Sequence, residues 1–258
     1  MAEVLNGPPY SIPTFALSID QFYLTHDAQQ RLASDHPSNP LIQHRGQPST
    51  HDLPLATEVL SSLRKGRQTC VPRFDKSAFD GEGDRAPEKE WEPVNEGRLT
   101  KLIIFEGWCI GFRAIPDPEL QERWENAVFR RAHDGYESRL ALCQLSSIQY
   151  VNNALQDYHQ LFDQIDLIIH LDAEDPLFVY EWRLEQEHHL RTSHGSSMTD
   201  DEVTRFVDGY YPAYELYTDG LRTGPNCTAS GQLRLILNKE RNLVKHNILD
   251  EDSPELKL

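Results

Sequence analysis

The sequence KLIIFEGWCIGF, residues 101–112, is the stretch from which the fold can be worked out. Its apolar run, residues 102–105, is short and β-prone and stands between a charged residue and a glycine, which predicts a strand buried on both faces. Such a strand is typical of the centre of a parallel sheet. The run ends on Glu106-Gly107, so it delivers one carboxylate to the sheet edge where α/β folds bind their ligands.

A second acid follows a second predicted strand. Residues 14–19 form another short β-prone run, and Asp20 comes directly after it in Asp20-Gln21-Phe22-Tyr23. For either acid alone, an ordinary solvated side chain at a strand end is the alternative interpretation. Two carboxylates at two strand ends could share a metal ion or a reacting hydroxyl group. Asp20 and Glu106 are therefore the first candidate site residues.

Composition restricts the class of protein. A chain of 258 residues is long enough for one large α/β domain, or for a domain with a smaller helical insert, and we expect one domain. With 41 acidic residues against 25 Lys and Arg, the net charge of −16 argues against nucleic acid or an anionic membrane as the main partner. An anionic substrate would then need a local basic site or a metal.

Targeting signals and cysteine spacing point to a soluble, cytoplasmic protein. No apolar stretch approaches the roughly 20 residues of a membrane span, and the amino terminus lacks the pattern of a secretory signal. The four cysteines are far apart, with no C-x-x-C pair, which indicates reduced thiols and no structural metal.

Two polar stretches are candidate binding loops. His51-Asp52 precedes residues 53–65, a predicted helix for which Asp52 is a plausible N-cap, so capping alone is the alternative interpretation. Residues 72–88 combine glycines with three cations, a composition suited to a small anion, although a solvated charged loop has the same composition. The glycine spacing there is not that of a dinucleotide-binding fingerprint.

The remaining periodicity predicts alternating helices and strands. A Thr199-to-Glu202 capping box opens the last predicted helix, which Pro212 should bend or end. His170, inside an apolar strand, is expected to be a satisfied core histidine. The other predicted helices span residues 119–131, 146–162 and 177–191, and the other strands span residues 167–171 and 233–237.

Six segments in order carry a family resemblance. They are ALSIDQFYLT (16–25), NPLIQHRGQPSTHDLPL (39–55), PRFDKSAFDGEGDRAPE (72–88), IIFEGWCIGFR (103–113), LDAEDPLFVYEWRLEQE (171–187) and MTDDEVTRFVDGYYPAYELY (198–217). Together they resemble the glycerate kinase family of small P-loop kinases, and in particular the fungal ATP-dependent kinases related to plant D-glycerate 3-kinase. The likeness covers most of the chain.

The resemblance implies a fold and a reaction. The fold is a three-layer α/β P-loop kinase-like parallel sheet with flanking helices and a helical lid at about residues 174–200, in a single domain over residues 1–258. The reaction is transfer of the ATP γ-phosphoryl group to the hydroxyl of a small metabolite, with glycerate as the leading acceptor. That step needs positioning, Mg²⁺ and neutralised phosphate charge.

The resemblance also assigns roles to residues. Asp20 would accept the proton of the acceptor hydroxyl, Glu106 would hold Mg²⁺ through water, and Arg183 would approach the transferring phosphoryl from the lid. Gln21 departs from the family pattern, because a second acid often follows Asp20; this bears on magnesium coordination. Asn238 and Lys239 would lie near adenine. The acceptor-binding residues would be Tyr23, His51, Asp52, Arg73, Asp75, Lys76 and Arg85.

One expected motif is not in the sequence. None of the 14 glycines belongs to a G-x-x-x-x-G-K-S/T run, whose backbone amides and lysine hold the phosphates in a P-loop kinase. Residues 1–5 look like the last turn of a helix, so our hypothesis is that the chain starts late and lacks the first strand, the loop and most of the first helix. Two alternatives stay open: a non-catalytic metabolite-binding or regulatory protein, and a kinase for a nucleoside or pantothenate.

Overall fold

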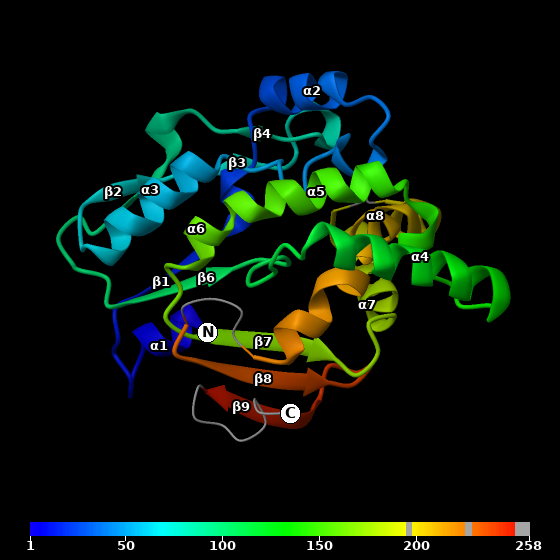
Figure 1. The fold of residues 1–258 in the computed structure, drawn as a ribbon. Coiled ribbons are helices and arrows are strands. Elements are labelled where there is room, and N and C mark those ends of the chain that lie inside the picture. Colours follow the sequence, from blue (N-terminus) through cyan, green and yellow to red (C-terminus); the bar gives the residue numbers. More distant parts are fainter. Residues whose placement is uncertain (195–197, 225–228, 251–258) are drawn as a thin grey trace. The chain divides into compact units, whose positions relative to one another are not determined.

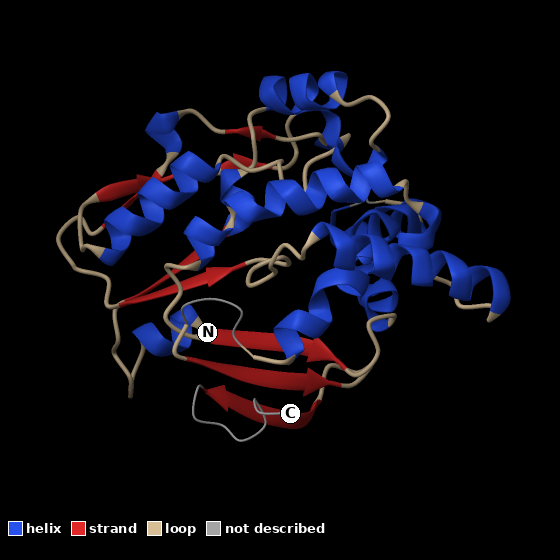
Figure 2. Ribbon diagram, viewed as in Figure 1, coloured by secondary structure: helices blue, strands red, loops and turns tan. Residues whose placement is uncertain are grey.

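The structure is a computed structural model that describes residues 1–194, 198–224 and 229–250. It has the mixed α/β composition that the sequence predicts, with helices beside small sheets (Figures 1 and 2). Contacts within the chain divide it into two compact units. Unit 1 comprises residues 1–110 and 153–164, and unit 2 comprises residues 111–152 and 165–258. Whether they form the single domain expected from the sequence stays a prediction.

Unit 1 is built on a parallel pair of strands. β1 (Thr14–Ser18) pairs with β6 (Leu102–Glu106), which lies beside it in Figure 1. The register places Ser18 opposite Glu106. Both strands form where they were predicted. The prediction that β6 is buried on both faces is wrong, because its end residues are exposed and the three between are half-buried. Among the described residues β6 pairs only with β1, so one edge of β6 stays open.

Short helices complete unit 1. The 3₁₀ turn η1 (Ile19–Phe22) continues β1, and α3 (Leu53–Arg64) packs against it. Asp52 caps α3 as predicted, since its carboxylate accepts from the Leu55 amide at 3.2 Å. The predicted helix over residues 146–162 is two helices with Tyr158 between them. The remaining helices are α1 (Ala2–Asn6), α2 (His26–Asp35), η2 (Pro40–Ile42) and α6 (His159–Phe162), with α5 (Leu145–Asp157) divided between the units.

The glycine-rich stretch over residues 72–88 contains a hairpin. β3 (Phe74–Asp75) pairs with β4 (Asp84–Arg85) in antiparallel fashion, with the turn η3 (Phe79–Gly81) between them. Beside this hairpin, β2 (Thr69–Val71) pairs with β5 (Glu92–Val94), and η4 (Glu88–Glu90) precedes β5. The polar side chains of residues 72–88 are therefore carried by a backbone with a defined hairpin structure.

Unit 2 contains a three-stranded sheet and the long helices. β7 (Ile168–Ala173) is parallel to β8 (Gly231–Leu237), which pairs with the antiparallel β9 (Leu243–Asp250). The expectation that His170 on β7 is hydrogen-bonded in the core is not fully met. Its Nδ1 is buried without a hydrogen-bond partner among the described residues. The helices are α4 (Asp117–His133), the turn η5 (Leu140–Leu142), α7 (Phe178–His194) and α8 (Asp200–Arg222).

The predicted lid corresponds to α7 and the start of α8, apart from residues 195–197, which lie outside the described residues. Thr199 and Glu202 form the predicted capping box, but α8 does not end at Pro212, which is buried. A proline removes one intrahelical hydrogen bond, and its burial on the packed face of a 23-residue helix offsets that loss.

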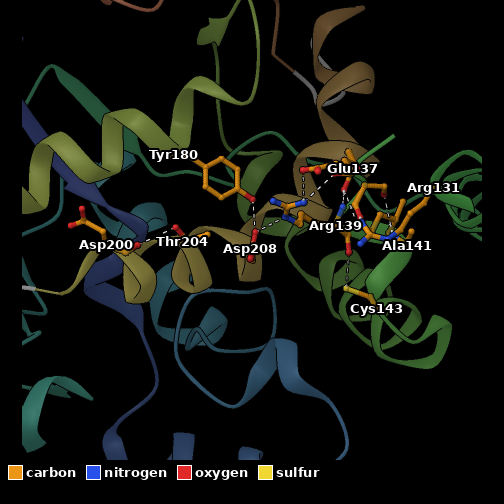
Figure 3. Close-up of polar contacts among 12 residues, drawn as sticks. Arg131, Glu137, Arg139, Ala141, Cys143, Tyr180, Asp200, Thr204 and Asp208 are labelled. Carbon is orange, nitrogen blue, oxygen red and sulfur yellow. Dashed lines mark hydrogen bonds and ion pairs between the residues drawn. The ribbon is translucent and has the colours of Figure 1, made fainter. Parts of the chain in front are cut away.

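Figure 3 shows how α7 is held to its neighbours in unit 2. The Tyr180 hydroxyl and the Arg139 guanidinium both donate to Asp208 on α8, each at 2.6 Å. Arg139 lies in the segment before η5, so one carboxylate joins three parts of the unit. Burial, and then the hydrogen bond to Asp208, raise the pKa of the Tyr180 phenol, so Tyr180 remains a donor at neutral pH.

Within the described residues, no helix is both long and apolar enough to cross a membrane. Cys70, Cys109 and Cys143 are free thiols there, whereas Cys227 lies outside the described residues. Burial raises the pKa of the Cys109 thiol to about 12. Cys109 is therefore a small apolar core residue rather than a reactive nucleophile.

Candidate functional site

The two predicted carboxylates lie at the same end of neighbouring strands. Parallel pairing puts Glu106 level with Ser18, and Asp20 follows two residues later on η1. The glycine after Glu106 allows this close arrangement: a Cβ at Gly107 would stand 2.4 Å from Cγ2 of Ile19. Glu106 is exposed, and its carboxylate has no ion-pair partner among the described residues. Both acids thus lie at strand ends as the sequence predicts, and their roles stay predictions.

Gln21, directly after Asp20, has a structural use. Its side-chain oxygen accepts from the Ser18 amide at 2.9 Å, completing a capping box for η1, and its amide nitrogen donates to the Pro72 carbonyl at 3.1 Å. An ionised carboxylate cannot donate, so Glu or Asp here would lose the second bond. Gln21 fastens the hairpin stretch to the turn that carries Asp20.

Two cations of residues 72–88 reach carboxylates of the site. Lys76 Nζ lies 2.5 Å from Asp20 Oδ2, with the lysine 59% and the aspartate 28% exposed. Arg85 is only 13% exposed; it donates to Asp52 Oδ2 and to the Tyr23 carbonyl, both at 2.9 Å. Asp52 thus caps α3 through one oxygen and pairs with Arg85 through the other. The predicted alternatives for this residue, capping and a site role, are compatible.

Tyr23 and His51 face each other across an isolated antiparallel bridge. Their rings are stacked with centroids 4.5 Å apart, and both side chains are buried. His51 Nδ1 lies 2.7 Å from the Tyr158 hydroxyl, while its Nε2 is buried without a hydrogen-bond partner among the described residues. Burial lowers the pKa of His51 to about 3, although the negative charge of Asp20 acts in the opposite direction.

Arg73 and Asp75 are engaged elsewhere on the same stretch. Arg73 pairs with Glu90 at the surface. Asp75 accepts from the backbone and hydroxyl of Ser77 at 3.0 and 2.6 Å, and these bonds hold the pKa of the Asp75 carboxyl below its usual value. The structure joins neither side chain to the group around Asp20.

The remaining predicted site residues are Arg183, Asn238 and Lys239. They belong to unit 2, where α7 contacts the turn between β8 and β9. Trp182 Nε1 donates to the Lys239 carbonyl at 2.6 Å, and Lys239 Nζ lies 2.7 Å from Glu181. Asn238 closes the turn by accepting from the Asn242 amide at 2.9 Å. A hollow of about 380 Å³ lies here, lined by Val179, Trp182, Arg183, Gln186 and Arg241.

Arg183 is one wall of that hollow. Its guanidinium pairs with Glu187 and donates to Gln186 at 2.9 Å, and it lies over the ring of Phe206 at 4.9 Å. Its Nε is buried without a partner among the described residues. Arg183 and Glu187 therefore form an i, i+4 ion pair, and the buried Nε–H remains unused.

Sequence reasoning missed several residues that shape unit 1. Tyr158 lies inside the predicted helix over residues 146–162, and nothing in its local pattern indicates a polar contact with His51. Trp108 Nε1 donates to the Gly46 carbonyl at 3.0 Å, and Arg45 donates to the Gly81 carbonyl at 2.7 Å. These contacts link segments far apart in the chain, so no sequence window contains both partners.

Among the described residues, no three His, Cys, Asp or Glu side chains converge to form a metal site. Mg²⁺ usually binds through one or two carboxylates, water and substrate phosphates, rather than through an all-protein site. The exposed, unpaired carboxylate of Glu106 fits that manner of binding.

Comparisons with known proteins found relatives that match most of this chain. No family model matches the chain. The kinase mug58 of Schizosaccharomyces pombe is 36% identical over 230 residues, which is 87% of this chain and 76% of that protein. The chloroplastic D-glycerate 3-kinase of Arabidopsis thaliana is 35% identical over 238 residues, which is 90% of this chain and 47% of that protein.

A solved structure shows the same fold. The D-glycerate 3-kinase from Cryptococcus neoformans has a TM-score of 0.87 and 34% sequence identity, and the match covers 95% of this chain and 83% of that one. Similarity of this extent, at this level of identity, confirms the resemblance drawn from the six sequence segments. The chain belongs to the glycerate kinase-like family of ATP-dependent small-molecule kinases.

Proposed function

We propose that this chain serves ATP-dependent phosphoryl transfer to the hydroxyl of a small polar metabolite, with glycerate as the first candidate acceptor. The observation that carries the proposal is the placement of Asp20 and Glu106 at the same end of two paired parallel strands. Relatives named as D-glycerate 3-kinases and an ATP-dependent kinase support both the reaction and the acceptor.

Asp20 is proposed to accept the proton of the acceptor hydroxyl. In this structure its Oδ2 is paired with Lys76 Nζ at 2.5 Å. Because the lysine is 59% exposed, their attraction is worth only about 0–1 kcal/mol, so an entering substrate can displace Lys76 at little cost. Lys76 is then free to contact an anionic group of the substrate.

The acceptor is proposed to bind between η1, the His51-Asp52 segment and the β3–β4 hairpin. Arg85 and Asp52 hold the segment and the hairpin together, which limits the movement of Tyr23 and His51. Small acids suit a site with nearby cations in a chain whose net charge is −16. Arg73 and Asp75 are proposed as further acceptor contacts at the rim.

The remaining predicted residues are proposed to bind Mg²⁺ and the nucleotide. Glu106 would hold Mg²⁺ through water, and the ion would supply positive charge to the phosphates during transfer. In unit 2, the hollow beside Asn238 and Lys239 has an aromatic wall and two guanidinium groups, which suits a purine nucleotide. Arg183, with one unused donor, is proposed to contact the transferring phosphoryl group.

We further propose that the parallel sheet continues beyond the strands described here. In the described part of the chain β6 pairs only with β1 and β7 only with β8, so each has an open edge. Ile169 and Leu171 of β7 are 50% and 66% exposed, unusual values for apolar strand residues. A further strand on the open edge of β6, followed by a G-x-x-x-x-G-K-S/T loop, would supply the phosphate site.

The genomic sequence upstream of the Met1 codon tests that extension. An in-frame strand, loop and helix carrying G-x-x-x-x-G-K-S/T are expected there, and an intergenic sequence would contradict the proposal. Tight binding of MgATP to the 258-residue chain alone, measured by calorimetry, would also contradict it.

A phosphorylation screen tests the reaction. Protein carrying the upstream segment is incubated with MgATP and with D-glycerate, other hydroxy acids, nucleosides or pantothenate, and ADP release is followed. We expect D-glycerate to react fastest, and Asp20→Asn to lower kcat by roughly 10²–10⁴-fold while acceptor binding is retained. The control Asp35→Asn changes an exposed aspartate of α2 and should leave kcat unchanged.

Three other results would contradict the proposal. Equal rates for Asp20→Asn and the parent would remove Asp20 from proton transfer. A nucleoside or pantothenate as the preferred acceptor would replace glycerate. Acceptor binding without any turnover, in protein that carries the upstream segment, would favour the non-catalytic metabolite-binding class.

A further inference from the structure

The surroundings of His51 are more specific than a packing role requires. The imidazole is 5% exposed and lies between the ring of Tyr23, stacked at 4.5 Å, and the edge of Tyr158, with centroids 5.7 Å apart. One ring nitrogen, Nδ1, is 2.7 Å from the Tyr158 hydroxyl, and the other has no partner among the described residues. A buried polar atom without a partner costs free energy, so it needs an explanation.

The hydrogen bonds of Tyr158 determine which nitrogen carries the proton. Its hydroxyl oxygen already accepts from the Ser49 amide at 3.1 Å, which favours donation of the hydroxyl proton to a second group. Among the described residues, His51 Nδ1 is the acceptor within reach. Since Nδ1 then accepts, a neutral imidazole must carry its proton on Nε2. The pKa of His51, lowered to about 3 by burial, agrees with a neutral ring at physiological pH.

The backbone at Ser49 supports the same arrangement. Ser49 has φ of +93°, a conformation that non-glycine residues rarely adopt, and its amide nevertheless donates to Tyr158. The Ser49 hydroxyl oxygen is itself buried without a partner among the described residues. Two unsatisfied polar atoms therefore occur two residues apart beside Tyr158, on the segment that pairs with Tyr23.

We infer that Tyr158 is a positioning residue which holds His51 as an Nε2–H donor, and that this donor is kept for an oxygen of the acceptor bound beside Asp20. The inference rests on the proposed function for the identity of that acceptor, a small hydroxy acid. The His51 Nε2–H group would thus be a neutral donor in the acceptor site. It would favour molecules that place a hydroxyl or carboxylate oxygen next to Nε2. Molecules without that oxygen would leave the donor unpaired and bind more weakly.

The tautomer is measurable without any ligand. Long-range ¹H–¹⁵N NMR distinguishes a protonated from an unprotonated imidazole nitrogen, and we expect His51 to be protonated on Nε2 in the parent chain. Tyr158→Phe should shift the population towards the Nδ1–H form. The control Tyr217→Phe removes another buried hydroxyl, bonded to Asn152 at 3.2 Å in unit 2, and should leave the His51 signals unchanged. An Nδ1–H tautomer in the parent chain would overturn the inference.

Titration with D-glycerate tests the reserved donor. Binding should move the Nε2 and Hε2 resonances of His51, and Tyr158→Phe should raise the Kd about tenfold, which corresponds to 1.4 kcal/mol. In the kinase assay the same change should appear in KM with little effect on kcat, because the bond is made equally in the bound and transition states. An unchanged Kd in Tyr158→Phe, with the tautomer altered, would overturn the assigned ligand contact.

His51→Gln provides a second variant that depends less on Tyr158. The glutamine amide places an N–H near the position of Nε2, so adding Tyr158→Phe to this background should change the Kd less than twofold. A tenfold change there would show that Tyr158 acts by another route and would overturn the inference. If the parent chain binds no hydroxy acid at all, the proposed acceptor fails together with the ligand contact, and the tautomer measurement still decides the role of Tyr158.

Discussion

Gly107→Ala should destabilise the protein at the junction that carries both carboxylates. A Cβ at this position would stand 2.4 Å from Cγ2 and 3.2 Å from Cβ of Ile19, and 3.4 Å from Cδ1 of Ile110. Ile19 cannot move aside easily, because it is fully buried and its branch point is the first side-chain carbon. Either β6 or η1 must therefore shift by several tenths of an ångström.

The expected magnitude follows from two opposing effects. Overpacking a well-packed site costs typically 1–3 kcal/mol, and a contact of 2.4 Å belongs to the upper half of that range. Replacing glycine stiffens the unfolded chain and returns about 0.4–1 kcal/mol. The free energy of unfolding should thus fall by about 1–2.6 kcal/mol, and Tm by about 2–4 °C for each kcal/mol.

Urea denaturation and thermal melts measure this change in the free energy of unfolding. Two further variants test whether the contact with Ile19 causes it. Gly209→Ala is the same substitution inside α8, where a new Cβ meets nothing within 4 Å, and should stabilise the protein by up to about 1 kcal/mol. Ile19→Leu moves the branch one carbon outward and should recover part of the loss in the Gly107→Ala background. A Gly107→Ala protein as stable as the parent would refute the reasoning, since Ile19 would then not define the position of η1.

Two further predictions concern the groups around the site. Arg85→Met leaves the Asp52 carboxylate and the Tyr23 carbonyl without their donor, so the free energy of unfolding should fall by about 1–3 kcal/mol; Lys89→Met, at the surface, should change it by under about 0.5 kcal/mol. Equal losses would contradict the role of the partly buried pair. The pKa of His51 is about 3 in the folded chain and 6.5 for the unperturbed group. Between pH 6.5 and pH 3, the unfolded state therefore binds a proton that the native state does not bind. Stability should therefore fall by up to about 1.4 kcal/mol per pH unit towards pH 3, a slope that His51→Gln removes in denaturation at several pH values.

The sequence alone was sufficient wherever the deciding interactions are local. Strands β1 and β6 could be read from apolar runs that end on an acid, and their carboxylates were placed at one sheet edge because parallel strands share their carboxyl ends. The Asp52 cap and the Thr199 capping box each join a side chain to a backbone amide three residues away. Such bonds lie within a single sequence window.

The tertiary structure alone decided which polar groups meet across the chain. His51 and Tyr158 are 107 residues apart, and Asp52 and Arg85 are 33 apart, so only the packing of whole elements brings these atoms together. The burial of β6 was misjudged for the same reason, since exposure depends on the strand beside it rather than on its own residues. The sequence determined the elements and the acids they carry, and packing determined the donors and cations that face those acids.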